Sequence, residues 1–375
     1  MNIRELADIL EFNGALRQII QPSLPCVGGN GGSCEPTITE ITHDSRKVVP
    51  GSLFACIRGG EQDGHSFAVD AKNRGACGLM CEEDTGENIV HLVVDDVRKR
   101  IGEVASAVFG NPSSKLKMFA VTGTNGKSTT AFMLRSIMDS AGEKVGIMGT
   151  IFYDDGSGIA VDADRTTPEA SDIQRMLALM SQNGCRSCVM EASSHGLSQQ
   201  RVSGCLFDGC VFTNLSPEHL DFHGTMGNYF ASKVKLFRDH MKGSDWKGVA
   251  NGDDPYGRRI REMFPGNVAL FGLEKANNPD FLGKIKRMDL EGIEMTVSGP
   301  FGESPMDLVL PVTGAFNARN ALGAAALSLM MGLPPGTVRK GLEKLPQVPG
   351  RLQRISLPDG VTALIDYAHT PDALY

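Results

Sequence analysis

A short glycine-rich segment, Gly123-Thr124-Asn125-Gly126-Lys127-Ser128-Thr129, carries the residue types that bind a polyphosphate. An apolar run, Met118 to Val121, precedes it and an amphipathic helical pattern follows, so the expected order is strand, phosphate loop, helix. Glycines let the backbone approach phosphate oxygens, Lys127 neutralises charge, and Ser128 offers a hydroxyl to Mg²⁺. Val121 stands where the general motif has its first glycine, so this is a shorter variant. The segment predicts a nucleoside triphosphate ligand, and a plain tight turn is the alternative.

Polar side chains follow other strand-like runs. Glu191 ends the run that starts at Cys188, and a carboxylate at a strand end near a phosphate loop suits Mg²⁺, which takes few protein oxygens. The polar segment after it, with Gln199 and Arg201, could hold an anion. Residues 165–169, Arg-Thr-Thr-Pro-Glu, form a polar loop that opens a helix, and from the sequence alone they could be a helix cap and nothing more.

A dense polar cluster lies between Asn214 and Gly224, with two histidines and two acids close together in sequence. A lone histidine is usually a packing or solvent residue, but this crowding favours a functional role. The helical pattern from Met226 to His240 then carries Lys233 among apolar positions. A lysine on a helix is normally a solvated charge, so spacing alone favours that interpretation for Lys233.

The composition of the 375 residues is that of a soluble globular protein, with 41% hydrophobic and 22% charged residues. The formal net charge of −7 argues against general binding to nucleic acid or to an anionic membrane. The N-terminal segment reads as an amphipathic helix and not as a signal peptide. The longest apolar run, 321–333, is shorter than the roughly 20 residues that a membrane helix needs. We therefore expect a soluble cytoplasmic protein, and a monomer.

Nine cysteines raise the question of disulfides or zinc. An odd number without an export signal favours reduced thiols. Four of them have spacings that approach a zinc site: Cys185, Cys188, Cys205 and Cys210. Two of these lie in short apolar runs that read as buried strands, so packing as small hydrophobic residues is the favoured interpretation.

The alternation of strand and helix patterns predicts an α/β fold. Residues 1–112 read as a small α/β domain, with helices at 66–74 and 97–109, in which Asp44-Ser45-Arg46 would by itself be a turn. Residues 113–347 read as a central domain of P-loop type with a mostly parallel sheet. Its strands are predicted at 118–121, 144–150, 188–191, 210–213, 247–251 and 268–271. Ligands bind such sheets at the carboxyl ends of the strands, which is where the polar clusters lie.

Taken together, these motifs resemble the Mur ligases, which form amide bonds in bacterial cell-wall precursors at the expense of ATP. The matching segments span most of the chain: 122–130, 165–169, 191–201, 214–233, 314–320, 350–351 and 366–372. The resemblance is strongest to the members that add diaminopimelate or lysine to UDP-N-acetylmuramoyl-L-alanyl-D-glutamate (UDP-MurNAc-L-Ala-D-Glu). It implies that a substrate carboxylate attacks the γ-phosphate, and that an amine then displaces phosphate from the acyl phosphate.

The resemblance also implies roles for individual residues. Lys127, His219 and Lys233 would be catalytic. Mg²⁺ would be held by Ser128, Glu191, His219 and Lys233, the last as a carbamate. ATP would meet the phosphate loop and later positions: Gly123, Thr124, Asn125, Gly126, Lys127, Ser128, Thr129, Asn317, Asn320, Arg351, Asp366 and His369. The UDP substrate would meet Ser45, Gly60, Glu61, Gln62, Thr166, Thr167, Ser193, Gln199 and Arg201.

The family has a further Rossmann-like domain, of which residues 348–375 would be the start. We expect the segment from Arg351 to Tyr375 to be a strand and a helix start with no sheet to join, loosely docked. On this interpretation the chain binds the UDP substrate and ATP but forms the amide poorly. Two alternatives stay open, a ligase like folylpolyglutamate synthetase and a non-catalytic UDP-sugar and ATP-binding fragment.

Overall fold

A computed structural model describes residues 1–21, 36–60, 62–358 and 361–368, which form two compact units. The first unit contains Met1–Lys115 together with Pro168–Leu179 and Gln199–Cys205. The second contains Leu116–Thr167, Met180–Ser198 and Leu206–Tyr375. The predicted division at 1–112, 113–347 and 348–375 stays a prediction, because a compact unit need not be an independently folding domain.

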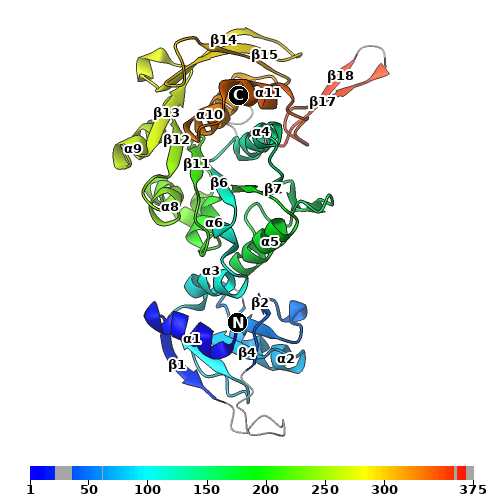
Figure 1. Cartoon of the computed structure of the whole chain (residues 1–375), viewed down its shortest axis with the longest axis vertical. Coiled ribbons are helices and arrows are strands. Elements are labelled where there is room, and N and C mark those ends of the chain that lie inside the picture. The colour runs from blue at the N-terminus through cyan, green and yellow to red at the C-terminus, as the bar shows by residue number, and fades with distance from the viewer. Residues whose placement is uncertain (22–35, 61, 359–360, 369–375) are drawn as a thin grey trace. The chain divides into compact units, whose positions relative to one another are not determined.

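The first unit holds a five-stranded sheet in the order β1-β5-β4-β3-β2, in which β1 is antiparallel and the other strands are parallel (Figure 1). Its strands are β1 Leu16–Ile20, β2 Glu40–Thr42, β3 Ser52–Ala55, β4 Gly78–Cys81 and β5 His91–Val94. Its helices are α1 Ile3–Phe12, η1 Ser45–Lys47, η2 Gly64–Phe67, α2 Ala68–Asn73, α3 Val97–Val108 and η3 Pro112–Ser114. The small α/β fold predicted for this region is confirmed.

The second unit is built on an eleven-stranded sheet in the order β16-β15-β14-β13-β12-β11-β6-β10-β7-β8-β9. The strands from β14 to β7 in this order are parallel, and both ends of the sheet are antiparallel. The parallel strands are β6 Lys117–Thr122, β7 Val145–Met148, β10 Ser187–Glu191, β11 Gly209–Phe212, β12 Lys247–Asn251, β13 Val268–Gly272 and β14 Phe281–Met288. The antiparallel additions are β8 Phe152–Asp154, β9 Val161–Asp162, β15 Ile293–Ser298 and β16 Met306–Leu310. The mostly parallel sheet and its predicted strands are confirmed.

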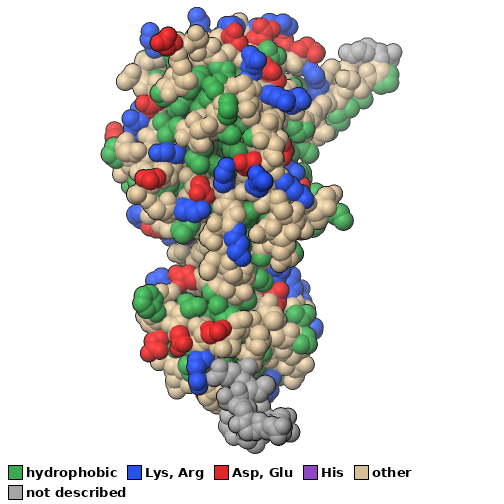
Figure 2. Space-filling view, in the orientation of Figure 1, with side chains coloured by type: hydrophobic (Ala, Val, Ile, Leu, Met, Phe, Trp, Pro, Cys, Tyr) green, Lys and Arg blue, Asp and Glu red, His purple; other side chains and the backbone are tan. Residues whose placement is uncertain are grey.

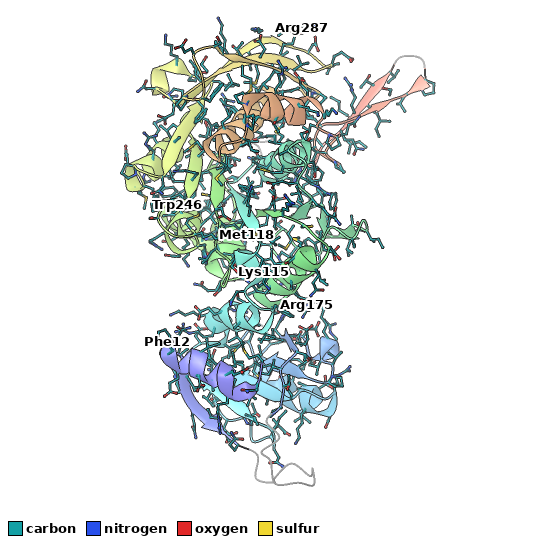
Figure 3. The ribbon with its side chains drawn as sticks, viewed as in Figure 1. Phe12, Lys115, Met118, Arg175, Trp246 and Arg287 are labelled. Atoms are coloured by element: carbon teal, nitrogen blue, oxygen red, sulfur yellow. The ribbon has the colours of Figure 1, made fainter. Side chains whose placement is uncertain are left out.

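Helices connect and cover these strands. They are α4 Lys127–Ser140, α6 Ser194–Ser198, α7 Leu220–His223, α8 Met226–Asp239, α9 Pro255–Met263, η4 Lys275–Asn277, α10 Ala315–Met330 and α11 Pro335–Glu343. Helix α5, Ala170–Gln182, belongs mostly to the first unit. The parallel strands are continuous apolar runs because both faces of the sheet are covered. Met118 on β6, which Figure 3 labels, is fully buried. Cys188 and Cys210 lie in buried strands of this kind, as predicted, and burial raises the pKa of Cys210 well above its ordinary value.

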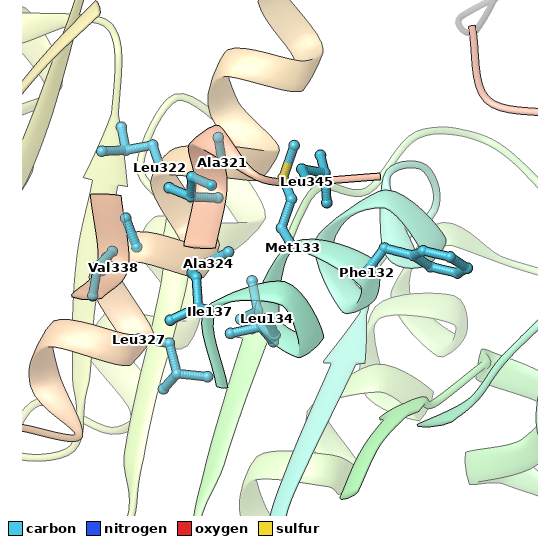
Figure 4. Close-up of a cluster of buried hydrophobic side chains, with 14 of the residues drawn as sticks. Phe132, Met133, Leu134, Ile137, Ala321, Leu322, Ala324, Leu327, Val338 and Leu345 are labelled. Carbon is cyan, nitrogen blue, oxygen red and sulfur yellow. The ribbon is translucent and has the colours of Figure 1, made fainter. Parts of the chain in front are cut away.

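The apolar run at 321–333 belongs mainly to α10, which packs with α4 and α11 in the main core of the second unit. Figure 4 shows side chains from these helices in one cluster, among them Leu134, Ile137, Leu327 and Val338. Full burial of each such side chain is worth about 1.5–3 kcal/mol. Among the residues that the structure describes, no helix is long and apolar enough to cross a bilayer.

The last described segment is a two-stranded antiparallel hairpin, β17 Gln353–Ser356 and β18 Thr362–Ile365. The expected strand is present and, within the described residues, joins neither of the two larger sheets, but it is not alone, because it pairs with a second strand that the sequence analysis did not predict. Backbone N–H and C=O groups of β17 form hydrogen bonds with those of β18. At the base of the hairpin, Leu352 N donates to Asp366 Oδ2. Ile355 and Leu364 of the hairpin are exposed. Figure 2 shows hydrophobic side chains in green on this part of the surface.

Gly341 provides a test of the packing between α11 and α4. A Cβ at this position would overlap the backbone of Ile137, and Ser136 Oγ donates a 2.7 Å hydrogen bond to Gly341 O. We expect Gly341→Ala to lower the free energy of unfolding by about 1–3 kcal/mol in urea denaturation. Gly336→Ala on the same helix is the control, because a Cβ there meets nothing within 4 Å. Equal stability of the two variants would contradict this account of the packing.

Candidate functional site

The phosphate loop connects β6 to α4, and both of its glycines are required by the structure. Gly123 has φ +150° and Gly126 has φ +83°, backbone conformations that side chains rarely adopt. A Cβ on Gly123 would overlap Thr213 Oγ1, and one on Gly126 would overlap Asn320 Oδ1. The loop is held from a neighbouring strand end, because Asn125 N donates to Asn214 Oδ1 at 2.9 Å. The glycine positions are therefore fixed both by conformation and by close packing.

Lys127 lies over the loop from the first turn of α4. Its Nζ donates to Gly123 O at 3.1 Å and to Thr124 O at 2.6 Å. Burial lowers the pKa of Lys127, and the carboxylates of Glu191 and Glu218 act in the opposite direction. The ammonium is thus placed where it can neutralise a phosphate bound by the loop.

Glu191 ends β10, directly beside β6, in register with Val121. Its side chain is buried, and each carboxylate oxygen accepts a hydrogen bond from Thr150: Oε1 from the backbone N at 2.9 Å and Oε2 from Oγ1 at 3.0 Å. The carboxylate is therefore fixed at the same sheet edge as the phosphate loop, as the strand-end argument predicted.

Three of the predicted substrate residues lie beside Glu191. Thr167 Oγ1 donates to Glu191 O at 2.8 Å and accepts from Ser193 N at 3.0 Å. Thr166 Oγ1 lies 3.0 Å from Thr150 Oγ1. The loop at 165–169 is therefore more than a helix cap, since it packs against the end of β10.

Lys233 is a buried amine and not a solvated charge, so the interpretation from helical spacing is wrong. Its side chain is 1% exposed, and Nζ donates to Gly123 O at 2.7 Å. Nζ also lies 4.6 Å from the ring centroid of Tyr229, whose Oη is 3.0 Å from Thr124 Oγ1. Burial, and then the charge of Lys127, lower the pKa of Lys233 well below that of an ordinary lysine. A neutral amine is the form that reacts with CO₂ to give a carbamate.

His219 has a left-handed backbone, with φ 54°, and belongs to a group of three histidines, His195, His219 and His223. The rings of His195 and His219 meet edge to face, with centroids 4.6 Å apart. Burial, and then the nearby His195, lower the pKa of His223 to about 4. His219 Nε2 lies 3.7 Å from Glu218 Oε2, so the crowding seen in the sequence is real.

The donors present suit one Mg²⁺ ion as they stand, and they suit a second only if Lys233 is a carbamate. Among the described residues, no group of three or more His, Cys, Asp or Glu side chains could hold a metal. Mg²⁺ does not require such a group, because it uses one or two carboxylates together with phosphate and water. The oxygens of Ser128 and Glu191 suit it in type. His219 and an unmodified Lys233 offer nitrogen, so Lys233 fits a hard cation only as a carbamate.

A cleft of about 680 Å³ in the second unit adjoins the loop. Predicted ATP residues lining it are Asn125, Gly126, Thr129, Asn317, Asn320, Arg351 and Asp366. Arg351 also reaches toward the loop, with Nη2 3.5 Å from Ser128 Oγ. Glu191, His219 and Lys233 are not among the lining residues.

Sequence reasoning missed other parts of the cleft. They include Asp253, Phe316, Arg319 and Tyr367. The side chain of Asp253 is 8% exposed, and it accepts from Leu273 N at 2.9 Å and from Arg319 Nε at 3.2 Å. Asp253 could have been found, because it lies in a polar Asn-Gly-Asp-Asp segment that begins at Asn251, the last residue of β12.

The remaining predicted substrate residues belong to the first unit. Ser45 begins η1, and the bond from Arg46 lowers the pKa of the adjacent Asp44 to about 2. Gly60 and Gln62 lie in a tight loop closed by a 2.8 Å bond from Gly59 N to Gln62 O.

Gln199 and Arg201 of the first unit contact each other, because Arg201 Nη2 donates to Gln199 Oε1 at 2.6 Å. Arg201 Nε also pairs with Glu169 Oε1 at 3.1 Å. Two predicted residues, Glu61 and His369, lie outside the described residues.

Comparison with known proteins agrees with this geometry. Residues 121–328 match the family model described as the Mur ligase middle domain, and residues 37–109 match that of the Mur ligase family catalytic domain. The chain is 39% identical over 367 residues to the UDP-N-acetylmuramoyl-L-alanyl-D-glutamate--2,6-diaminopimelate ligase of Geobacter metallireducens, covering 96% of this chain and 70% of that protein.

Two solved structures are similar in fold. A structure of a UDP-N-acetylmuramoyl-L-alanyl-D-glutamate--2,6-diaminopimelate ligase superposes with a TM-score of 0.75 at 28% identity, over 93% of this chain and 71% of the other. The Mycobacterium tuberculosis folylpolyglutamate synthase complexed with ADP superposes with a TM-score of 0.58 at 18% identity, over 72% of this chain and 66% of the other. The second likeness shows a shared fold alone.

The parallel sheet with its phosphate loop, strand-end carboxylate and adjoining cleft defines a nucleotide-binding α/β enzyme of P-loop type. The two family models and the relative that aligns with nearly the whole chain identify the family within this class of enzymes. The chain belongs to the Mur ligase family, and it is a ligase.

The buried amine of Lys233 predicts a pH-dependent difference in stability. A native pKa below the value of about 10.4 for an unfolded lysine means that the unfolded state binds more protons, so this residue makes the free energy of unfolding rise with pH in that interval. We expect Lys233→Met to be more stable relative to wild type at neutral pH than at about pH 10. Urea denaturation in CO₂-free buffer measures this. A difference that stays constant with pH would contradict a buried neutral amine.

Proposed function

We propose that the chain acts in the ATP-dependent addition of diaminopimelate to UDP-MurNAc-L-Ala-D-Glu, with lysine as the alternative amino acid. The observation that carries this proposal is the similarity, over 96% of the chain, to a relative named UDP-N-acetylmuramoyl-L-alanyl-D-glutamate--2,6-diaminopimelate ligase. The geometry supports it, because the phosphate loop, Glu191 and the Thr166-Thr167 loop meet at one sheet edge.

The reaction would proceed in two steps. A substrate carboxylate oxygen attacks the γ-phosphorus, and the bond to the bridging oxygen breaks to leave ADP and an acyl phosphate. The amine nitrogen then attacks the acyl carbon, phosphate leaves from the tetrahedral intermediate, and the amine loses a proton. Lys127 and the loop amides stabilise the charge spread over the transferring phosphoryl group. Two anions must meet in this reaction, so the placement of cationic groups is its main requirement.

Ser128 and Glu191 would hold one Mg²⁺, and His219 with a carbamylated Lys233 would hold a second. When bound, these ions would neutralise negative charge between the substrate carboxylate and the phosphates. The buried position of Lys233 supports carbamylation, because the reacting amine must be unprotonated. Its Nζ is 2.7 Å from Gly123 O, so the modified side chain would lie at the phosphate loop.

The cleft beside the loop would hold the part of ATP that is not transferred, namely the base, the ribose and the remaining phosphates. Asn317 and Asn320 at the start of α10 offer amide groups to the base, and Arg351 and Asp366 offer a cation and an acceptor to the phosphates and ribose. We extend the same assignment to His369, which the family resemblance places with them.

The residues assigned to the UDP substrate are those that the family resemblance implies. Ser45, Gly60, Glu61 and Gln62 are assigned to its nucleotide end. Its peptide-bearing side is assigned to Thr166, Thr167, Ser193, Gln199 and Arg201. The hydroxyls of Thr167 and Ser193 support this, since they lie 3.1 Å apart beside Glu191.

Lys127→Ala tests the phosphate-loop assignment. We expect it to weaken ATP binding and to abolish ATP turnover, because the γ-phosphate charge loses its neutralising group, while UDP-MurNAc-L-Ala-D-Glu binding stays close to wild type. Calorimetric titration of each ligand gives both affinities. Lys115→Ala, a lysine before β6 in the first unit, is the matched control and should leave both unchanged. Unaltered ATP turnover in Lys127→Ala would refute the assignment.

Competition binding separates this function from the folate alternative, whose support is a shared fold. We expect UDP-MurNAc-L-Ala-D-Glu to bind and a folate polyglutamate acceptor not to displace it, because the Thr-Thr and Ser-Ser-His segments suit the muramoyl substrate. Displacement of the UDP substrate by the folate would favour a function like that of folylpolyglutamate synthetase. The proposed function predicts slow but measurable amide formation, so binding of both the UDP substrate and ATP with no amide at all would favour the non-catalytic alternative.

A further inference from the structure

Thr150 makes an unusual pair of bonds to Glu191. It follows β7, the strand next to β10, and its backbone N and Oγ1 each bind a different oxygen of the same carboxylate, at 2.9 Å and 3.0 Å. Gly149 makes this possible, because a Cβ there would overlap Glu191 Oε1. One residue therefore fixes both the rotation and the position of the carboxylate, and leaves each oxygen further lone pairs.

The same hydroxyl reaches the loop that precedes α5. Thr150 Oγ1 lies 3.0 Å from Thr166 Oγ1, and a threonine hydroxyl has one proton. Because that proton goes to Glu191 Oε2, Thr150 accepts the proton of Thr166. The hydrogen bonds run in one direction, from Thr166 through Thr150 to Glu191.

The loop carrying Thr166 is itself anchored. Arg165 N donates to Tyr153 Oη at 3.1 Å, and Tyr153 stands on β8, just beyond Thr150 in the chain. The short segment from Gly149 to Tyr153 therefore forms hydrogen bonds both with Glu191 and with the loop that carries Thr166.

We propose that Thr150 is a positioning residue that orients Glu191 toward a divalent cation and couples that cation to the substrate contact at Thr166. This inference rests on the proposed function, which makes Glu191 a cation ligand and Thr166 a substrate residue. Groups that hold a metal-binding carboxylate typically contribute 10–100-fold to metal affinity. Coupling through a shared hydroxyl is reciprocal, so cation and UDP substrate should strengthen each other's binding.

The test titrates Mn²⁺ into the full chain and reads free Mn²⁺ by electron paramagnetic resonance, with and without UDP-MurNAc-L-Ala-D-Glu. Thr150→Val keeps the shape and the backbone donor but removes the hydroxyl, and it should raise the Kd for Mn²⁺ by about 10–100-fold. It should also remove the effect of the UDP substrate on that Kd. Thr150→Ser restores the hydroxyl and should stay within about threefold of wild type.

Two further variants make the outcomes distinct. Thr337→Val, on a half-buried threonine of α11 outside the cleft, controls for the substitution itself and should bind as wild type. Thermal melting checks folding, and Thr150→Ala replaces Thr150→Val if the latter does not fold. Wild-type Mn²⁺ affinity in Thr150→Val, with weakened affinity in Glu191→Gln, overturns the role of Thr150 alone. Wild-type affinity in Glu191→Gln overturns the cation assignment in the proposed function, and the role of Thr150 with it.

Discussion

The parallel pairing of β6 with β10 is the interaction on which the candidate site depends. Ala192 N donates to Val121 O at 2.9 Å and Thr122 Oγ1 donates to Ala192 O at 2.7 Å, so the ladder continues past the end of β10. One strand then turns into the phosphate loop and the other ends in Glu191. Because parallel strands end at the same edge, a cation-binding carboxylate and a phosphate-binding loop become neighbours without any contact that is specific to a ligand.

Burial of charge is the cost of this arrangement. Lys127 and Lys233 both lie against carbonyls of the same loop, and burial lowers the pKa of each. An unpaired ammonium in such a place is unfavourable, and the acids Glu191 and Glu218 offset only part of the penalty. A polyphosphate would complete the charge balance for Lys127. Conversion to a carbamate would place a negative charge at Lys233.

The sequence predicted much of this, for reasons visible in single residues. Glu191 was identifiable because a polar residue ended an apolar strand, and the loop because glycine, lysine and hydroxyl stood in a known order. Helical spacing wrongly indicated a solvated Lys233, because spacing shows which face of a helix a residue occupies and not what packs against that face. Thr150 escaped notice because its role depends on Glu191, a partner distant in sequence. The hairpin at 353–365 was missed since pairing of two short strands leaves little periodic signal.

The close approach of Gly126 to Asn320 has a kinetic meaning as well. The loop stands near the start of the second unit and α10 near its end, so the two sides of the cleft come from opposite ends of a long stretch of chain. Closing such a non-local contact is slow, because the intervening segments must be ordered first. The cleft should therefore be among the last features to form as the chain folds, and nucleotide binding would report completion of the whole sheet. Ligands that bind it would stabilise the finished fold and not its partly formed intermediates.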